Sequence, residues 1–363
     1  MRLALLLLLG ACSFDHGRVI GATGDGGPTD DTGSDSGPTL RTRKLVFDNS
    51  ASTADFTAFP VLVALDASTI DYALVNDPAT DLRFEYASQG TAASPGDSVP
   101  FEIERWNPGG ESLVWIRVPE IPHGSTDTAV LMHYGQGAGG QADVGATWAD
   151  WELVNHMTAD LASSAGSYTA TSVNTTVAAG QMGEAAGFAS GGDHRVTFAN
   201  AGALFDGWVE WTLSFWLYAD YADADALGNA EPGVMDKGGP LVLGRLYRNG
   251  EDLRFQVDLH FEANVVYAYL ISLPARTWTM VTITSDGDAL YIAKNGNAFG
   301  SAELTGTNQA LLSSTQSYFL GSANNCFTGS IDELRIERRF RPNDYVHAQY
   351  LAMTRQFVTF TDP

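Results

Sequence analysis

The sequence predicts an all-β protein with two antiparallel β-sandwich domains that follow a disordered tether. Short apolar runs alternate with polar residues, and this period of two places successive side chains on opposite faces of a strand. Clusters of Gly, Pro, Asn, Asp and Ser separate the runs and are typical of tight turns. Only residues 342–353 show the apolar spacing of a helix, with Pro342 near the first turn.

Composition narrows the classes of partner. The chain has 363 residues, which is long enough for two domains of ordinary size. Its formal net charge is −23, and its only lysines are Lys44, Lys237 and Lys294. So acidic a surface repels phosphate backbones, and we therefore expect no nucleic-acid partner. The many carboxylates suit hard cations such as Ca²⁺.

The first residues have the pattern of an export signal. The charged start Met1-Arg2 precedes an apolar run, residues 3–9, that is too short to span a bilayer as a helix. The run ends in Leu9-Gly10-Ala11-Cys12, which closely resembles the lipobox of bacterial lipoproteins. The resemblance implies a signal peptide over residues 1–11 and acylation of Cys12. The alternative is an ordinary cleaved signal followed by an incidental cysteine.

The same resemblance implies a location. The protein would be lipid-anchored in the bacterial cell envelope, and Ser13 after the cysteine favours the outer membrane or cell surface. Residues 12–39 form the predicted tether, since they are rich in Gly, Asp and Thr and cannot bury enough apolar surface to offset chain entropy. With Cys12 acylated, Cys326 has no disulfide partner, and we expect it to pack as a small hydrophobe.

Residues 40–138 are predicted to form the first sandwich, from strands over 44–48, 59–66, 82–86, 99–106, 113–118 and 128–134. The segments 47–50, 59–63, 82–84, 100–106 and 132–135 resemble a bacterial domain of unknown function that often precedes LamG-like modules in exported proteins. This resemblance implies no known activity. Glu102 and Glu104 share one side of a strand, as a pair of catalytic carboxylates could. We expect instead a solvated sheet face, with Arg83 and Arg105 as ion-pair partners.

Residues 147–363 are predicted to form the second sandwich. Its strands are expected over 151–157, 209–218, 253–261, 265–271, 278–284, 289–294, 329–337 and 357–360. Alternation places Trp211, Leu213, Phe215 and Leu217 on one face. Asn295-Gly296 is a hairpin turn signal, because a type I′ turn needs positive φ at both central residues.

Several segments of this second region resemble the LamG-like jellyroll of the concanavalin A-like lectin and glucanase superfamily. They are residues 213–217, 278–282, 290–296, 329–336 and 342–345. Glucanases of that superfamily carry Glu-x-Asp-x-x-Glu on one strand. Around Asp332 the two glutamate positions hold Ser330 and Arg335, so we predict no catalytic residues here and no enzyme.

The resemblance also implies Ca²⁺, which the superfamily often binds through oxygen ligands. Asp332 is one candidate ligand, since strict alternation places its carboxylate on an apolar face with Leu334 and Ile336, where a bare charge is costly. Asp193, after Gly191-Gly192, is the other candidate ligand. The alternative is that both carboxylates cap backbone N–H groups in tight loops.

A polar row on one predicted strand is the candidate ligand-binding surface. It consists of Arg254, Gln256, Asp258 and His260, with Tyr267 or Tyr269 beside it as an aromatic platform. A plain solvated face is the alternative. The sequence thus predicts a lipid-anchored envelope or surface protein that binds carbohydrate or a protein partner. A glycan-active enzyme with an unrecognised site, or a passive structural module, are the other hypotheses.

Overall fold

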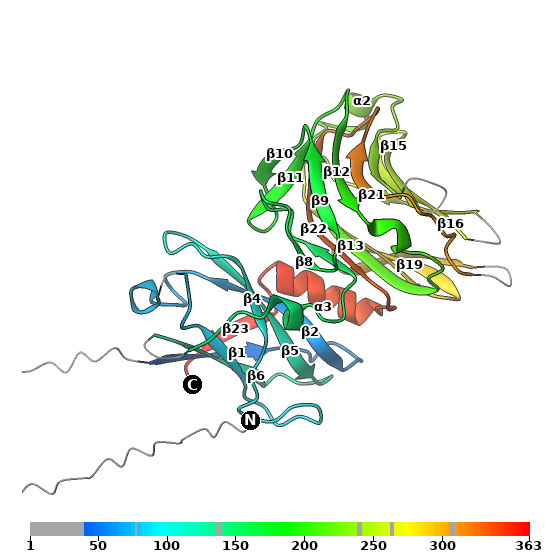
Figure 1. Ribbon diagram of the computed structural model, residues 1–363. Coiled ribbons are helices and arrows are strands. Elements are labelled where there is room, and N and C mark those ends of the chain that lie inside the picture. The colour runs from blue at the N-terminus through cyan, green and yellow to red at the C-terminus, as the bar shows by residue number, and fades with distance from the viewer. Residues whose placement is uncertain (1–39, 77, 136–138, 238–241, 262–264, 305–308) are drawn as a thin grey trace, which may run out of the picture. The chain divides into compact units, whose positions relative to one another are not determined.

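The computed structural model describes residues 40–363, apart from 77, 136–138, 238–241, 262–264 and 305–308. The predicted signal peptide, Cys12 and the tether lie outside these residues. The described part is all-β apart from a few short helices, as predicted, and it forms two sandwiches (Figure 1). None of its helices is long and apolar enough to cross a membrane.

The first sandwich packs a four-stranded sheet against a three-stranded sheet within the described residues. The larger sheet has the order β23-β1-β6-β3, and the smaller has the order β2-β5-β4. Apolar side chains that alternate along these strands fill the space between the sheets. The strands are β1 (Arg41–Phe47), β2 (Phe56–Leu65), β3 (Arg83–Tyr86), β4 (Phe101–Arg105), β5 (Ser112–Ile121), β6 (Thr128–Tyr134) and β23 (Val358–Thr361).

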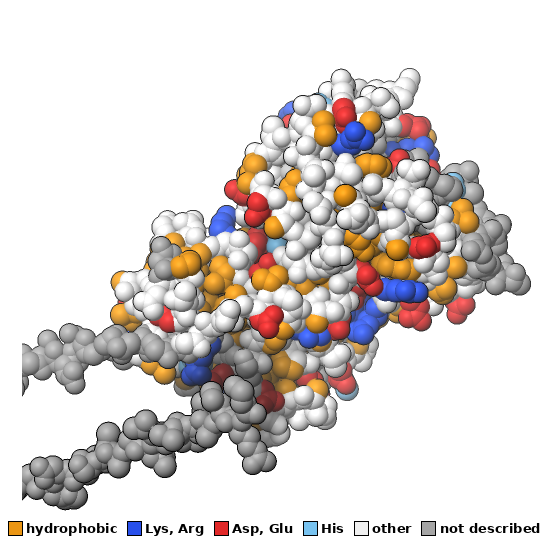
Figure 2. Space-filling view, viewed as in Figure 1, with side chains coloured by type: hydrophobic (Ala, Val, Ile, Leu, Met, Phe, Trp, Pro, Cys, Tyr) orange, Lys and Arg blue, Asp and Glu red, His pale blue; other side chains and the backbone are white. Residues whose placement is uncertain are grey.

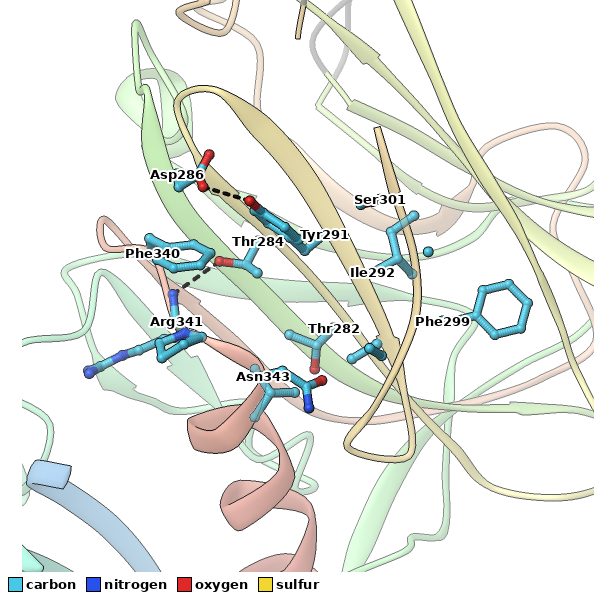
Figure 3. Close-up of a pocket in the computed structure, with 15 residues that line it drawn as sticks. Thr282, Thr284, Asp286, Tyr291, Ile292, Phe299, Ser301, Phe340, Arg341 and Asn343 are labelled. Atoms are coloured by element: carbon cyan, nitrogen blue, oxygen red, sulfur yellow. Dashed lines mark hydrogen bonds between the residues drawn. The ribbon is translucent and has the colours of Figure 1, made fainter. Parts of the chain in front are cut away.

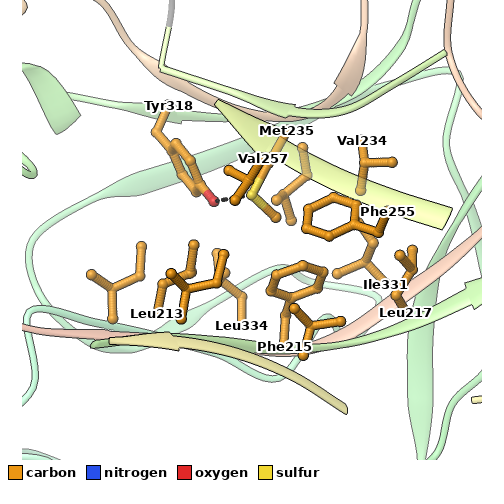
Figure 4. Packing of buried hydrophobic residues seen from close by; sticks show 14 of the residues in the cluster. Leu213, Phe215, Leu217, Val234, Met235, Phe255, Val257, Tyr318, Ile331 and Leu334 are labelled. Atoms are coloured by element: carbon orange, nitrogen blue, oxygen red, sulfur yellow. Dashed lines mark hydrogen bonds between the residues drawn. The ribbon is translucent and has the colours of Figure 1, made fainter. Parts of the chain in front are cut away.

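The second sandwich contains two larger antiparallel sheets. In the part that the structure describes, one has the order β10-β11-β22-β13-β18-β19-β20, with β7 also paired to β22 and β8 paired to β7. The other has the order β17-β16-β15-β14-β21-β12-β9. We call them the nine-stranded and seven-stranded sheets. Leu213, Phe215 and Leu217 of the first meet Phe255 and Val257 of the second in the core between them (Figure 4). Trp211 also joins this core, as the alternation predicted.

The elements of this second sandwich are β7 (Leu153–Asn155), β8 (Ser163–Ala165), β9 (Thr169–Val173), β10 (Thr176–Ala179), β11 (Glu184–Phe188), β12 (His194–Ala199), β13 (Glu210–Ala219), β14 (Gly233–Asp236), β15 (Val242–Asn249), β16 (Asp252–His260), β17 (Val265–Ser272), β18 (Thr279–Asp286), β19 (Ala289–Lys294), β20 (Asn297–Glu303), β21 (Tyr318–Ser322) and β22 (Gly329–Glu337). The α-helices of the described residues are α1 (Val144–Thr147), α2 (Ala224–Leu227) and α3 (Asn343–Met353), and single turns of 3-10 helix lie at Tyr72–Leu74 and Ala201–Ala203. Asn295 and Gly296 join β19 to β20 with φ of 51° and 73°, which confirms the predicted turn.

The C-terminal residues belong to the first sandwich, and the prediction that they continue the second is wrong. β23 pairs antiparallel with β1, with Phe360 opposite Leu45. α3, predicted over 342–353, packs against β2, where the ring of Tyr345 meets Phe59 edge-on at 4.9 Å. The physical reason is burial. Without this segment, the edge of β1 and the aromatic core of the first sandwich would be exposed to water.

A bulge in β22 changes which side chains share a face. Ser214 and Trp216, two residues apart on β13, lie opposite Arg335 and Asp332, which are three apart on β22. The irregular residue is Glu333, with φ of +53°. Leu334 therefore points into the core with Ile331, while Asp332 points away from it. The predicted grouping of Asp332 with Leu334 and Ile336 is thus wrong.

Candidate functional site

A pocket opens on the outer face of the nine-stranded sheet, over β18, β19 and β20. Tyr291 of β19 lies opposite Thr284 of β18 and Ser301 of β20. Directly opposed residues in a sheet share a face, so these three side chains form one row across the strands. They point away from the core because Leu290 and Ile292, their neighbours in sequence, lie inside it.

The residues before and at the start of α3 form the other wall of this pocket. Phe340, Arg341 and Asn343 stand across from the strands, and Phe299 of β20 lies at the far end from Phe340 (Figure 3). The backbone N–H of Arg341 donates to Oγ1 of Thr284 at 3.1 Å, which ties this wall to the sheet. The cavity so formed has a volume of about 570 Å³. We call it the aromatic groove.

The groove exposes two aromatic rings to solvent. Tyr291 is 38% exposed and Phe299 is 44% exposed. Among the described residues these are the two aromatic side chains in the group of exposed large hydrophobics, and both line the same pocket. The ring of Tyr291 also lies 5.5 Å from that of Phe340. No other aromatic side chain that the structure describes is exposed to this degree.

Polar groups accompany the rings. Oδ2 of Asp286 accepts a hydrogen bond from the hydroxyl of Tyr291 at 2.8 Å (Figure 3). Burial alone would raise the pKa of Asp286, but hydrogen bonds from Tyr291 and from backbone N–H groups, that of Ala289 foremost, lower it. Asp286 is therefore an ionised acceptor. The hydroxyl of Thr282, also in the lining, is buried and has no hydrogen-bond partner among the described residues.

A second polar site lies buried between the two sandwiches, at a surface that we call the seam. Here β4 and β5 of the first sandwich face β22 and β7 of the second, around Trp115, Trp148 and Met182. His156, just after β7, has Nδ1 2.6 Å from Oε1 of Glu333 and Nε2 3.2 Å from Oε2 of Glu102.

Glu102 and Glu104 take part in this seam, and the prediction of a solvated face is wrong. The Glu102 residue is 7% exposed, and the Glu104 side chain is 2% exposed. Nε1–H of Trp115 donates to Glu104 at 2.8 Å, and the hydroxyl of Ser164 donates to Glu102 at 2.5 Å. These hydrogen bonds take the place of those that water would make to an exposed carboxylate. Of the predicted ion-pair partners, Arg83 pairs with Glu85 and Arg105 with Glu111.

The ionisable groups of the seam have pKa values that are shifted in opposite directions. Burial and the neighbouring Glu333 raise the pKa of Glu104 to about 7. Burial opposes the ionisation of Glu333 too, but His156 and Arg335 outweigh it and lower the pKa of Glu333 to about 2. The pKa of His156 is held well above its usual value, since Glu333, Glu104 and Glu102 overcome the effect of burial. Arg335 lies over Trp115 and donates to Glu333.

The two predicted calcium ligands lie in different surroundings. Asp332 is fully buried in the seam, where Oδ2 accepts from the backbone N–H of Met182 at 3.0 Å. Burial and Glu333 raise its pKa well above the usual value. Asp193 precedes β12 of the seven-stranded sheet and forms an ion pair with Arg195 at 2.9 Å. In the described residues the two carboxylates have no contact in common, so they do not form one site.

The predicted polar row is present on β16, but its members bond to one another or to neighbours. Asp258 is 5% exposed, pairs with Arg245 at 2.9 Å and accepts from Gln256 at 2.7 Å. Arg254 donates to Asp252 at 2.8 Å. His260 is half-buried at the end of the strand. Tyr267 lies opposite Asp258 in the backbone register, and the side chains of Tyr267 and Tyr269 lie outside the described ones.

The aromatic groove was missed by the sequence analysis, although part of its signal was available. Tyr291 falls on the polar parity of an otherwise apolar strand, between Leu290 and Ile292, so its ring had to face away from the core. Nothing local indicated that Phe340 and the start of α3 would close the other side. The seam was missed because its members come from segments up to about 230 residues apart.

Comparisons with known proteins concern the second sandwich. Residues 190–347 match the family model Laminin_G_3, described as the concanavalin A-like lectin/glucanases superfamily. No curated protein matches the chain.

Several solved structures are similar in part. The binding domain of Paraclostridial Mosquitocidal Protein 1 has 11% identity and a TM-score of 0.48, with 56% of this chain and 52% of that chain covered. Domain 4 of AbnA, a GH43 extracellular arabinanase from Geobacillus stearothermophilus solved in complex with arabinotriose, has 19% identity and a TM-score of 0.43, with 55% and 99% covered. The receptor binding domain of botulinum neurotoxin C/D mosaic serotype has 14% identity and a TM-score of 0.46, with 56% and 51% covered. The chain thus spans about half the length of the two toxin domains. With the family match and the two packed antiparallel sheets, the second sandwich is a concanavalin A-like jellyroll.

Proposed function

We propose that this protein binds carbohydrate and that the aromatic groove is the binding site. The observation that carries the proposal is the gathering of Tyr291 and Phe299, both exposed, in one pocket. Sugar rings present apolar C–H faces and polar edges. Aromatic rings with a few polar groups beside them match both kinds of surface.

The polar lining supports the same class of ligand. Asp286 offers a carboxylate with an acceptor position left beside its hydrogen bonds from Tyr291, Asp288 and Ala289, and Thr282 adds a hydroxyl to the lining. Lys and Arg side chains on the face shown in Figure 2 occur in small groups near Asp and Glu rather than as one basic surface. These features favour a neutral glycan over an anionic one.

The proposal includes a place and a mode of action. A lipid on Cys12 would hold the chain at the envelope, and residues 12–39 would carry the sandwiches away from the membrane surface. The protein would bind without turnover, because the two positions around Asp332 where glucanases of the superfamily carry glutamates hold Ser330 and Arg335. Calcium at Asp193 or Asp332 is a separate proposal, which a melting curve with chelator and with added Ca²⁺ tests.

The test is a panel of glycans and cell-wall polysaccharides presented to the purified full chain, followed by calorimetry with the best ligand. Tyr291→Ala and Phe299→Ala should each weaken binding about tenfold, which corresponds to about 1.4 kcal/mol. The control is Val177→Ala, a side chain 55% exposed on β10 at the other edge of the sheet, which should bind as the wild type does.

Two further variants separate the groove from the β16 row. Arg254→Ala and His260→Ala should leave the affinity unchanged if the groove is the site. Loss of binding in these variants, with full binding in Tyr291→Ala, would place the ligand on β16 instead. Release of reducing sugar from any polysaccharide by the wild type would contradict a pure binding role.

A further inference from the structure

Three ligand atoms converge in the seam between the sandwiches. They are Nδ1 of His156 and one carboxylate oxygen each of Glu104 and Glu333, all within 4.8 Å of one another. The nitrogen lies 2.6 Å from Glu333 and 3.7 Å from Glu104. Two ligands of a tetrahedral zinc ion stand about 3.3 Å apart when each bond is about 2.0–2.1 Å. The observed distances lie on either side of that value.

Each of the three side chains is held by a second partner. Trp115 donates to Glu104 at 2.8 Å, Arg335 donates to Glu333, and Glu102 faces Nε2 of His156 at 3.2 Å. A carboxylate behind the distal nitrogen of a histidine is the usual way in which proteins orient a metal-binding imidazole. With Nε2–H donating to Glu102, Nδ1 is left facing two carboxylates, which requires a cation or a proton between them.

Asp332 adds an independent sign of a missing partner. Its side chain is fully buried, and Oδ1 has no hydrogen-bond partner in the described part of the chain. This carboxylate interacts electrostatically with Glu333, Glu104 and His156. A buried oxygen without a partner is costly, and a cation held by these neighbours would offset that cost.

A cavity open to solvent adjoins the cluster at Glu104. The cavity, of about 420 Å³ at the edge of the seam, is lined by Glu104, with Arg105 and Trp106 on the first sandwich and Asp160, Gly183 and Glu184 on the second. Because the Glu104 side chain is 2% exposed, an ion would enter from this cavity by movement of that side chain, without separation of the sandwiches. The His156 and Glu333 side chains behind it are 4% and 0% exposed.

We propose that Glu104, His156 and Glu333 bind one divalent transition-metal ion, of the class of Zn²⁺, across the seam. One nitrogen and two carboxylate oxygens suit such an ion, whereas Ca²⁺ takes oxygen ligands only, six to eight of them. Glu104 comes from the first sandwich and the other two ligands from the second. The ion therefore joins the two sandwiches directly.

The experiment begins with the full chain, stripped by a chelator that is then dialysed away. Zn²⁺ alone is titrated, bound metal is counted by equilibrium dialysis, and melting is followed in parallel. The expected result is one ion per chain and a higher melting temperature. Glu104→Gln and His156→Gln should weaken binding by at least tenfold, and Glu102→Gln by about 10–100-fold. Glu184→Gln, which lines the cavity but is not a ligand, should bind as the wild type does.

Co²⁺ bound to the wild type keeps the test decisive if the variants fail to fold. A site of this kind should give visible absorption bands clearly stronger than those of aqueous Co²⁺. A spectrum like that of the aqueous ion, a wild type without stoichiometric Zn²⁺, or a folded Glu104→Gln with unchanged affinity would overturn the proposal. In each of these cases His156 is an imidazolium held by its carboxylates. Loss of glycan binding in Tyr291→Ala with zinc binding intact would show that the two sites are separate.

Discussion

The guanidinium carbon of Arg335 lies 4.0 Å from the ring centroid of Trp115, and this contact joins β22 of the second sandwich to β5 of the first. Both side chains are fully buried. The charge of Arg335 is compensated by Glu333, on the same strand. The seam is thus crossed by a cation–aromatic contact whose buried charge is neutralised within β22.

Arg335→Met should destabilise the protein strongly. The substitution leaves Glu333 buried without its guanidinium partner, and removal of one member of a buried pair costs about 3–5 kcal/mol. Urea unfolding of the two proteins under identical metal-free conditions measures the change. Arg339→Met, an exposed position on the same segment, serves as the control and should change the unfolding free energy by about 0.5 kcal/mol or less. Equal effects of the two substitutions would contradict the importance of this contact.

Phe357→Ala should destabilise the first sandwich, although this residue is more than 200 positions away in sequence from β1–β6. Its ring lies 5.5 Å from Phe59 and 6.2 Å from Phe47, and a core Phe→Ala substitution costs about 3–5 kcal/mol. The nearby Phe360→Ala, half-buried on β23, should cost clearly less. Unfolding free energies of both variants give the comparison, and a neutral Phe357→Ala would contradict the assignment of this segment.

Gly296→Ala should cost more than Gly207→Ala. Both glycines have positive φ, of 73° and 66°, so both substitutions place a side chain on a backbone that disfavours one. A Cβ on Gly296 would lie 2.6 Å from Cβ of Tyr350 and 3.0 Å from Cα of His347, both on α3, whereas a Cβ on Gly207 meets nothing within 4 Å. The difference in melting temperature therefore reports the packing of the β19–β20 turn on α3. Because both elements line the aromatic groove, the Gly296 variant should also bind glycan more weakly.

Cys326 should resist alkylation in the folded protein. It is fully buried, as predicted, and burial raises the pKa of its thiol to about 11. At pH 8 the thiolate fraction is then about 0.001, against about a quarter for an ordinary thiol with pKa about 8.5. In a Cys12→Ser background, iodoacetamide should label Cys326 hundreds of times more slowly than in urea. Complete labelling of the folded protein within minutes at pH 8 would contradict this.

Local patterns predicted β1–β6 of the first sandwich and seven of the sixteen described strands of the second, because alternation is a property of each strand and its own turn. The β13 core face and the Asn295-Gly296 turn are examples. Local patterns gave wrong predictions where the surroundings of a side chain are set by residues far away in the sequence. Glu102 and Glu104 look like a solvated face until Trp148, His156 and Glu333 cover them. Asp332 looks like a core residue until the bulge at Glu333 reverses the parity.

The return of β23 to β1 has a consequence for synthesis. Until Val358–Thr361 has been made, β1 is an open edge of its sheet, and the hydrophobic surface that Phe357 and Tyr345 cover stays in water. The jellyroll strands, in contrast, are all present once Glu337 has been made. The first sandwich therefore lacks its last strand until the end of synthesis, although most of it is translated first. The jellyroll, inserted between β6 and α3, has all its strands before that point.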